Sequence, residues 1–261
     1  MKSIQAIFFD IDGTLVSFKS HQVPLGVKEA LAQLQANGIK IFIATGRMQS
    51  MLTVIDDIPF DGYVTYNGAY CVDGQKKRIY SNPIPQDDLT AFVDYLQVHS
   101  FPVSFMKEEE MTINYVNDKV RSLAQHVGVE VPRIEDPRIA IQDPVYQLCI
   151  YVDEDKEREI LQTVFTHCAS NRWSPVFADV NVAINNKQTG IDRMLEHYGI
   201  DLQETMAFGD GGNDILMLKH VVIGVAMGNA SDEVKASADY VTDTVDDQGI
   251  VNALTHFGLI D

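Results

Sequence analysis

The chain has 261 residues, 46% of them hydrophobic and 22% charged, which is typical of a globular protein with one large domain or two modest ones. Its formal net charge of −17 argues against nucleic acid or an anionic membrane as partner, because both attract basic surfaces. A small phosphorylated ligand is still compatible with this charge, since a local cationic pocket can override the global field. No feature indicates a protein partner.

The three cysteines are scattered and form no CxxC pair, so we expect reduced thiols in the core. No basic segment followed by an apolar one precedes the first predicted strand. No apolar stretch approaches the roughly 18 residues that a membrane helix requires. The sequence therefore predicts a cytoplasmic protein.

The most informative feature lies near the start of the chain. Ile4–Phe9 is a continuous apolar run, as expected of a strand buried on both faces, and it ends in Asp10-Ile11-Asp12-Gly13. Strand side chains alternate, so both acids face the same way if the extended geometry persists. Such a pair suits a carboxylate nucleophile, a proton-transfer group and a hard cation. Asp12-Gly13 is by itself also a turn signal.

The pattern continues as an α/β unit. Apolar residues at positions 27, 30, 31 and 34 predict a helix that ends at Gly38, and Ile39–Ala44 predicts a second buried strand. A strand, a helix and a strand within about forty residues indicate a right-handed βαβ unit with a parallel sheet. Turn signals at Asn67-Gly68 and Asp73-Gly74 then predict a hairpin-like stretch.

The middle of the chain differs from both ends. Residues 85–184 alternate irregularly between helical and strand patterns, which predicts a mixed α+β insert large enough to be a domain. We expect helices at 89–96, 118–127 and 153–167, strands at 102–106, 111–116, 146–152 and within 173–184, and a loop at 130–144.

The α/β pattern returns near the C-terminus. A helix at 191–198 ends at Gly199, and Thr205–Gly209 is a short strand followed by Asp210-Gly211-Gly212-Asn213-Asp214. A helix through Lys219, a strand at 221–227 and a helix at 231–238 follow. In open parallel sheets, ligands bind beyond the carboxyl ends of the strands. We therefore expect the acids at 10, 12 and 210 to converge, although they lie about two hundred positions apart.

Four segments in this order resemble the motifs of the haloacid dehalogenase superfamily of phosphohydrolases. Asp10-Ile11-Asp12-Gly13-Thr14 is similar to DxDG[TS], Gly209–Asp214 is similar to GDxxND, and Thr45 and Lys187 stand in the second and third positions. Because 32 residues separate Asp12 from Thr45 and 141 separate Thr45 from Lys187, the insert resembles the large cap of the Cof-type group.

The resemblance implies a doubly wound, Rossmann-like parallel-sheet core with an inserted α+β cap. The core would comprise residues 1–84 and 185–261, and the cap, which would select the substrate, residues 85–184. The whole-chain pattern is similar to that of bacterial hexose phosphate phosphatases. It implies a Mg²⁺-dependent phosphomonoesterase acting on sugar phosphates or similar small metabolites.

The catalytic and metal-binding roles follow from this resemblance and from the chemistry of phosphoryl transfer. Asp10 is expected to attack phosphorus and form an aspartyl-phosphate, while Asp12 protonates the leaving oxygen and then activates water. Mg²⁺ would be held by Asp10, the backbone carbonyl of Asp12, and Asp210, while Asp214 would orient these ligands or reach the ion through a water molecule.

The substrate-binding roles fall to five residues. Lys187 would place a positive charge near Asp10 and the phosphate. Thr45, the amide of Gly46, and Asn213 would donate hydrogen bonds to phosphate oxygens. Arg47 either contacts the substrate or lies in the first turn of a helix.

Two other functions stay open at this point. A phosphosugar mutase would need basic residues for a second phosphate, yet positions 85–184 hold 17 acidic and 8 basic residues, which disfavours it. A non-catalytic metal-binding module would keep the fold without turnover. The preferred sugar and the oligomeric state do not follow from the sequence.

Overall fold

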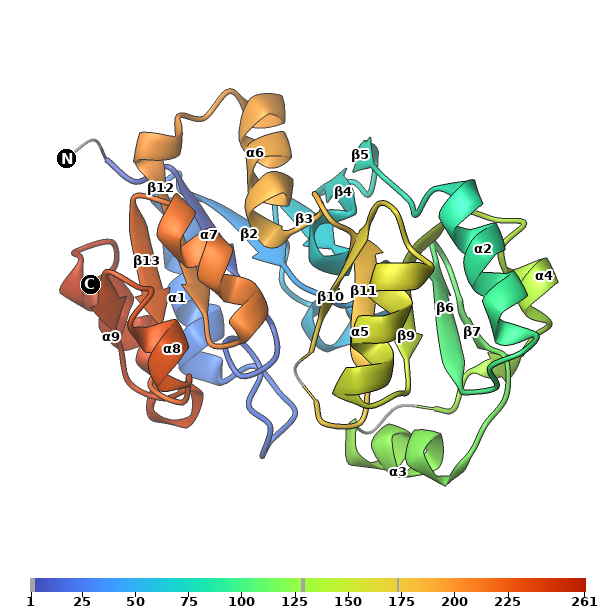
Figure 1. Ribbon diagram of the computed structural model, residues 1–261. Helices are drawn as coiled ribbons and strands as arrows, with labels where there is room; N and C mark the ends of the chain where they lie inside the picture. The colour runs from blue at the N-terminus through green and yellow to red at the C-terminus, as the bar shows by residue number, and fades with distance from the viewer. Residues whose placement is uncertain (1–2, 128–129, 173) are drawn as a thin grey trace. The chain divides into compact units, whose positions relative to one another are not determined.

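The computed structural model describes residues 3–127, 130–172 and 174–261 of the protein (Figure 1). The chain divides into two compact units. The first contains Met1–Arg47, Met51–Ser81 and Asn186–Asp261, and the second contains Met48–Ser50 and Asn82–Asn185. Trp173, within the stretch where strands are predicted, lies outside the described residues.

The first unit is built on an eight-stranded sheet in the order β14-β13-β12-β1-β2-β3-β4-β5. The strands from β14 to β3 run parallel to one another, and β4 and β5 are added antiparallel at one edge. Their bounds are β1 (Ala6–Phe9), β2 (Lys40–Ala44), β3 (Gly62–Thr65), β4 (Tyr70–Asp73), β5 (Arg78–Ser81), β12 (Thr205–Gly209), β13 (Ile223–Ala226) and β14 (Tyr240–Val241).

Helices cover both faces of this sheet, as the continuous apolar strands require (Figure 1). Ala6 and Phe8 of β1 pack in one apolar cluster with residues of α6 and α7, while α1 and α9 contact each other on the opposite side. This arrangement confirms the predicted doubly wound α/β fold. The helices are α1 (Leu25–Ala36), α6 (Lys187–Tyr198), α7 (Ile215–His220), α8 (Asp232–Lys235) and α9 (Gly249–His256).

The second unit is an α+β sandwich, also as predicted. Its six-stranded sheet has the order β10-β11-β9-β6-β7-β8, and side chains from α2 and α5 pack with one of its faces in a single core. The elements are α2 (Gln86–Leu96), β6 (Val103–Lys107), β7 (Met111–Ile113), α3 (Asp118–Val127), β8 (Arg133–Ile134), α4 (Pro137–Ala140), β9 (Val145–Ile150), α5 (Glu154–Thr163), β10 (Cys168–Asn171) and β11 (Ala178–Val182).

Several predicted bounds differ from the structure. The predicted loop 130–144 contains the short elements β8 and α4. Helix α4 forms because the Asp136 side chain accepts a hydrogen bond from the Arg138 amide and proline occupies the first turn. The predicted helix 153–167 ends at Thr163, and β10 and α9 were not predicted. The helix predicted at 231–238 spans only Asp232–Lys235.

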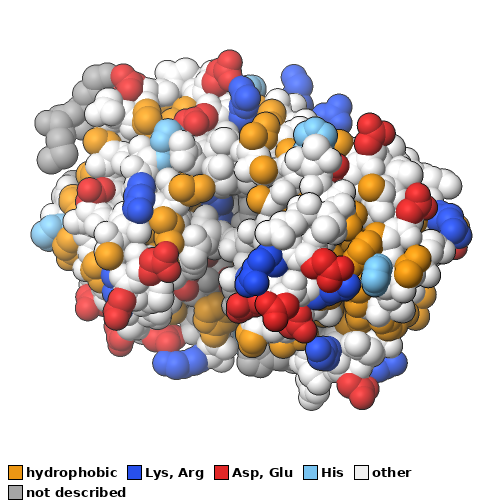
Figure 2. Space-filling model, viewed as in Figure 1, with side chains coloured by type: hydrophobic (Ala, Val, Ile, Leu, Met, Phe, Trp, Pro, Cys, Tyr) orange, Lys and Arg blue, Asp and Glu red, His pale blue; other side chains and the backbone are white. Residues whose placement is uncertain are grey.

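Acidic and basic side chains are intermixed on the face of the molecule shown in Figure 2. In the part of the chain that the structure describes, no helix combines the length and the apolar character that a membrane span requires.

Candidate active site

The sheet order brings the predicted motifs to one edge of the first unit. Strand β1 lies between β12 and β2, with Phe9 in register with both Phe208 and Ile43. The residues that follow these strands therefore emerge side by side. Carboxylate oxygens of Asp10, Asp210 and Asp214 all lie within 4.8 Å of one another. The predicted convergence of positions 10 and 210 is thus present.

Lys187 bridges two of these acids from the start of α6. Its Nζ donates to Oδ1 of Asp10 at 2.6 Å and to Oδ1 of Asp214 at 2.5 Å. The side chain is fully buried. The helix begins here because the side chain of Asn186 accepts from the Thr189 amide and completes a capping box. The helix start thus fixes the ammonium against Asp10.

Asp214 shapes the turn that carries Asp210. Its Oδ2 accepts hydrogen bonds from the backbone amides of Asp210 at 2.9 Å and Gly211 at 2.8 Å, while its Oδ1 accepts from Lys187. The Asp214 side chain is fully buried. Both carboxylate oxygens are therefore engaged by the protein, which suits an orienting role.

Asp210 is held by two side chains that the sequence analysis did not identify. Thr14 Oγ1 donates to Oδ1 at 2.8 Å, and Asn229 Nδ2 donates to Oδ2 at 3.2 Å. Asn229 also donates to the carbonyl of Gly13 at 2.8 Å. Gly13 has a φ of +85°, and a Cβ there would lie 2.2 Å from Asp210, so this turn requires glycine.

The side chain of Asp12 is not one of the three clustered acids and is paired with Arg47. The guanidinium donates from Nε to Oδ2 at 2.8 Å and from Nη2 to Oδ1 at 2.7 Å, a bidentate geometry. Arg47 also donates to the carbonyl of Met51 at 2.9 Å. Arg47 precedes the short 3₁₀ turn Gln49–Met51 rather than lying inside a helix.

The other predicted phosphate-binding residues lie at the same edge of the sheet. Thr45 is buried, and its Oγ1 accepts from the Arg47 amide at 3.1 Å, which tightens the turn around Gly46. Asn213 Nδ2 donates to Asn67 Oδ1 at 3.0 Å. The sequence predicts only a hairpin-like turn at Asn67 and assigns it no part in the site.

The cluster carries an electrostatic imbalance. Burial raises the pKa of Asp10 well above its usual value; Lys187 opposes the rise, and the neighbouring carboxylates add to it. Burial, followed by Asp214, raises the pKa of Asp210 to about 7. Although burial opposes it, the pair of Asp10 and Asp214 raises the pKa of Lys187 above its usual range. Three carboxylates thus face one ammonium.

A divalent cation fits this donor set. When all three are ionised, Asp10, Asp210 and Asp214 leave an excess of two negative charges after Lys187, and carboxylate oxygens are the ligands that Mg²⁺ prefers. Because Asp214 is already engaged by Lys187 and two amides, Asp10 and Asp210 are the better candidates for direct ligands. The Asp12 side chain is not part of this cluster, so only its backbone carbonyl could contribute.

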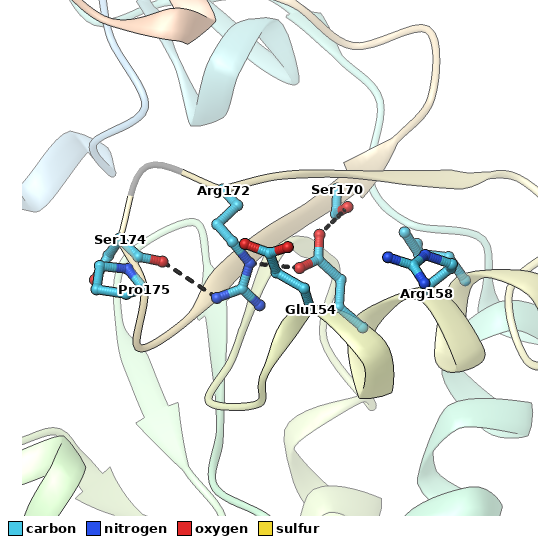
Figure 3. A pocket seen from close by; sticks show the side chains of 8 residues that line it. Glu154, Arg158, Ser170, Arg172, Ser174 and Pro175 are labelled. Atoms are coloured by element: carbon cyan, nitrogen blue, oxygen red, sulfur yellow. Dashed lines mark hydrogen bonds and ion pairs between the residues drawn. The ribbon is translucent and has the colours of Figure 1, made fainter.

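The second unit contains a separate pocket of about 690 Å³ between α5 and β10 (Figure 3). Its charged groups compensate one another, since Glu157 accepts from Arg172 at 2.6 Å and also from Ser170. None of the predicted site residues lies there. The lining consists of Glu154, Glu157, Arg158, Leu161, Ser170, Arg172, Ser174 and Pro175.

Comparison with known proteins places this geometry in a family. Residues 7–254 match the haloacid dehalogenase-like hydrolases. The chain is 42% identical to the subclass IIB sugar phosphatase BT4131, with a TM-score of 0.90 over 98% of this chain and 100% of that one. It is 41% identical to BT1666 of Bacteroides thetaiotaomicron, described among the phosphatases of the superfamily, with a TM-score of 0.93 over 99% and 96% of the two chains.

A relative found by sequence comparison is also similar to the chain over nearly its whole length. YkrA of Bacillus subtilis is 31% identical over 97% of this chain and 98% of its own length. Together with the buried acids around Lys187, these matches establish the chain as a phosphatase of the haloacid dehalogenase-like hydrolase family.

Proposed function

We propose that the protein is a Mg²⁺-dependent phosphomonoesterase that hydrolyses small phosphorylated metabolites, most notably hexose phosphates, through an aspartyl-phosphate. The observation that carries this proposal is the contact of 2.6 Å between Lys187 and Asp10 inside a cluster of three carboxylates. The choice of sugar phosphates is supported by the similarity to BT4131, which covers nearly the whole chain.

Asp10 is the proposed nucleophile. Attack on phosphorus through its Oδ2 would leave the contact between Lys187 and Oδ1 in place. A new bond forms between this oxygen and phosphorus while the bond from phosphorus to the sugar oxygen breaks. Water then attacks the acyl-phosphate and releases inorganic phosphate, which restores the carboxylate.

Asp12 is the proposed proton carrier. It would give a proton to the leaving sugar oxygen and later take one from the attacking water. In the structure both of its oxygens accept hydrogen bonds from Arg47. Donation of a proton therefore requires Asp12 to exchange Arg47 for the substrate, and Arg47 would then be able to turn toward the phosphate.

The remaining residues bind phosphate and metal. Thr45, the amide of Gly46, Lys187 and Asn213 would donate to the phosphate oxygens, each from the same edge of the sheet. When bound, Mg²⁺ would neutralise charge on the nucleophile and the phosphate. Asp10, Asp210 and the carbonyl of Asp12 are the proposed ligands, and Asp214 holds the Asp210 turn in place.

The second unit is proposed to act as the cap that selects the leaving group. This assignment rests on the family and on the separation of the chain into two compact units. Phosphate release measured across sugar phosphates, nucleotides and simple phosphoesters would test the substrate class. A preference for nucleotides would contradict the hexose phosphate assignment.

Two substitutions test the mechanism directly. Asp10→Asn is expected to abolish phosphate release while leaving the fold intact, as the circular dichroism spectrum would show, because it removes the nucleophilic charge and keeps the shape. Asp12→Ala is expected to slow turnover about 10²- to 10⁴-fold, the usual contribution of a positioned acid or base. Near-normal turnover by Asp10→Asn would refute the covalent mechanism, and isomerised sugar phosphate as product would indicate a mutase.

A further inference from the structure

The turn between β3 and β4 has an unusual backbone. Tyr66, Asn67 and Gly68 have φ values of +50°, +53° and +96° in succession. Asparagine and glycine tolerate this region, but a bulky residue such as tyrosine rarely adopts it. The turn is also buried, with Tyr66 fully inaccessible and Asn67 only 6% exposed. A strained backbone of this kind persists only where surrounding contacts enforce it, and it is often found at functional sites.

The same turn contacts the Thr45–Arg47 segment. The Asn67 amide donates to the Thr45 carbonyl at 3.0 Å, and the Tyr66 amide donates to the Arg47 carbonyl at 3.1 Å. The Asn67 side chain lies against Gly46, where a Cβ would be 3.1 Å from Nδ2. The backbone that carries two proposed phosphate donors is therefore fastened to this turn.

Two further elements of the site meet the turn on its other sides. Asn67 Oδ1 accepts from Asn213 Nδ2, which comes from a segment 146 positions away in the chain. Gly68 packs on the cap of α6, since a Cβ there would lie 2.0 Å from the carbonyl oxygen of Asn186. Asn186 immediately precedes Lys187. The turn thus contacts all three segments that supply the proposed phosphate-binding residues.

We propose that Asn67 is a positioning residue of the phosphate site: its side chain fixes the Asn213 amide against the Thr45–Arg47 turn. This inference rests on the proposed function and names a role for a residue that does not itself carry out the chemistry. The left-handed backbone is what directs the Asn67 side chain inward to Asn213, and the contacts at Gly68 and Thr45 hold that backbone.

An ordinary Asn-Gly hairpin turn would explain the positive φ values at this turn but not its burial or its contact with Asn213. Asn-Gly pairs are common in tight hairpins because both residues accept a positive φ. Such turns commonly lie at the surface. Lys76, in the next turn of the same sheet, has a φ of +64° and is exposed, and it provides the comparison. Asn67 differs in being buried and bonded to a distant part of the chain.

Two substitutions separate the side chain from the backbone. Asn67→Gly keeps the left-handed backbone and removes the amide, whereas Asn67→Ala removes the amide and also strains the turn. We expect Asn67→Gly to lower kcat/KM for a hexose phosphate about tenfold, the upper range for one buried hydrogen bond. It should weaken inhibition by vanadate, which mimics the five-coordinate phosphorus, more than inhibition by inorganic phosphate.

Lys76→Gly is the matched control, because it introduces glycine at a positive φ away from the proposed site. It should leave both inhibition constants unchanged. Thermal unfolding of each variant separates loss of fold from loss of positioning. If wild-type protein hydrolyses sugar phosphates and Asn67→Gly keeps the wild-type ratio of vanadate to phosphate affinity, the inference is wrong. If wild-type protein releases no phosphate, the proposed function itself fails.

Discussion

At the scale of single residues, the site is defined by a fully buried ammonium between two carboxylates. A buried ion pair costs desolvation free energy, which its partners must offset. Lys187 has two such partners, Asp10 and Asp214, at 2.6 and 2.5 Å. The third acid of the cluster, Asp210, is held by Thr14 and Asn229 instead. Lys187 is therefore a structural requirement of the site as well as a proposed phosphate ligand.

Lys187→Met should destabilise the metal-free protein by about 3–5 kcal/mol, since it leaves two buried carboxylates without a counter-charge. Burial already raises the pKa of Asp10 above its usual value, and Lys187 opposes that rise, so the variant should lose more stability than the wild type as the pH rises. Urea unfolding with a chelator at pH 5 and pH 8 measures this. Lys28→Met, at an exposed pair with Asp57, is the control and should lower the stability far less than Lys187→Met does.

At the scale of elements, short turns fix the site by touching the ends of strands and helices. The turn between β3 and β4 contacts the start of α6 through Gly68 and Asn186. In the second unit, the buried Asp88 of α2 accepts from the amides of Thr166 and His167, which lie just before β10. Neither contact is local in the sequence.

Gly68→Ala should be far more destabilising than the same change at Gly38. Both glycines have a positive φ, but a Cβ at Gly68 would lie 2.0 Å from Asn186, whereas Gly38 has open space. Gly38→Ala should therefore cost only the backbone strain of about 1–2 kcal/mol. Chemical denaturation of the two variants gives the comparison, and equal losses would contradict the close packing of the turn on α6.

Asp88 should make the protein sensitive to acid. Burial opposes ionisation, but the amides of His167 and Thr166 outweigh it and lower the pKa of Asp88 below 3.8. A carboxyl whose folded pKa is depressed stabilises the fold above its unfolded pKa and loses that contribution as the pH falls through the folded value. Asp88→Asn should therefore be less stable than wild type at pH 7, and the difference should shrink below about pH 4. Unfolding free energies across this range test the prediction.

At the scale of the whole molecule, net charge and metal binding are linked. The chain carries a net charge of −17, and three of its acids are gathered in one buried cluster. A cation that binds only the folded state stabilises it by mass action, by about 2.7 kcal/mol at a hundredfold excess over Kd.

Mg²⁺ should accordingly raise the unfolding temperature of the wild-type protein, and Asp210→Asn should abolish most of that rise. Asp246→Asn is the control, because Asp246 is paired with Ser17 and Lys19 outside the cluster. Thermal scans with chelator and with millimolar Mg²⁺ provide the measurement. An equal rise in Asp210→Asn would show that the ion acts elsewhere.

The sequence by itself determined the α/β class, most of the strands and the residues at their carboxyl ends. Short, largely apolar runs such as those of β1 and β12 favour strands buried on both faces, and a parallel sheet gathers their ends at one edge. The motif around Asp10 and the motif around Asp210 were therefore readable before any coordinates.

Only the tertiary structure decided which side chains pair. That Arg47 holds Asp12, that Asn229 and Thr14 hold Asp210, and that Asn67 reaches Asn213 depends on contacts between residues distant in sequence. The short elements β8, α4 and β10 also could not be predicted from the sequence. They are too short to show a period, and they form because neighbouring strands and caps satisfy their backbone groups.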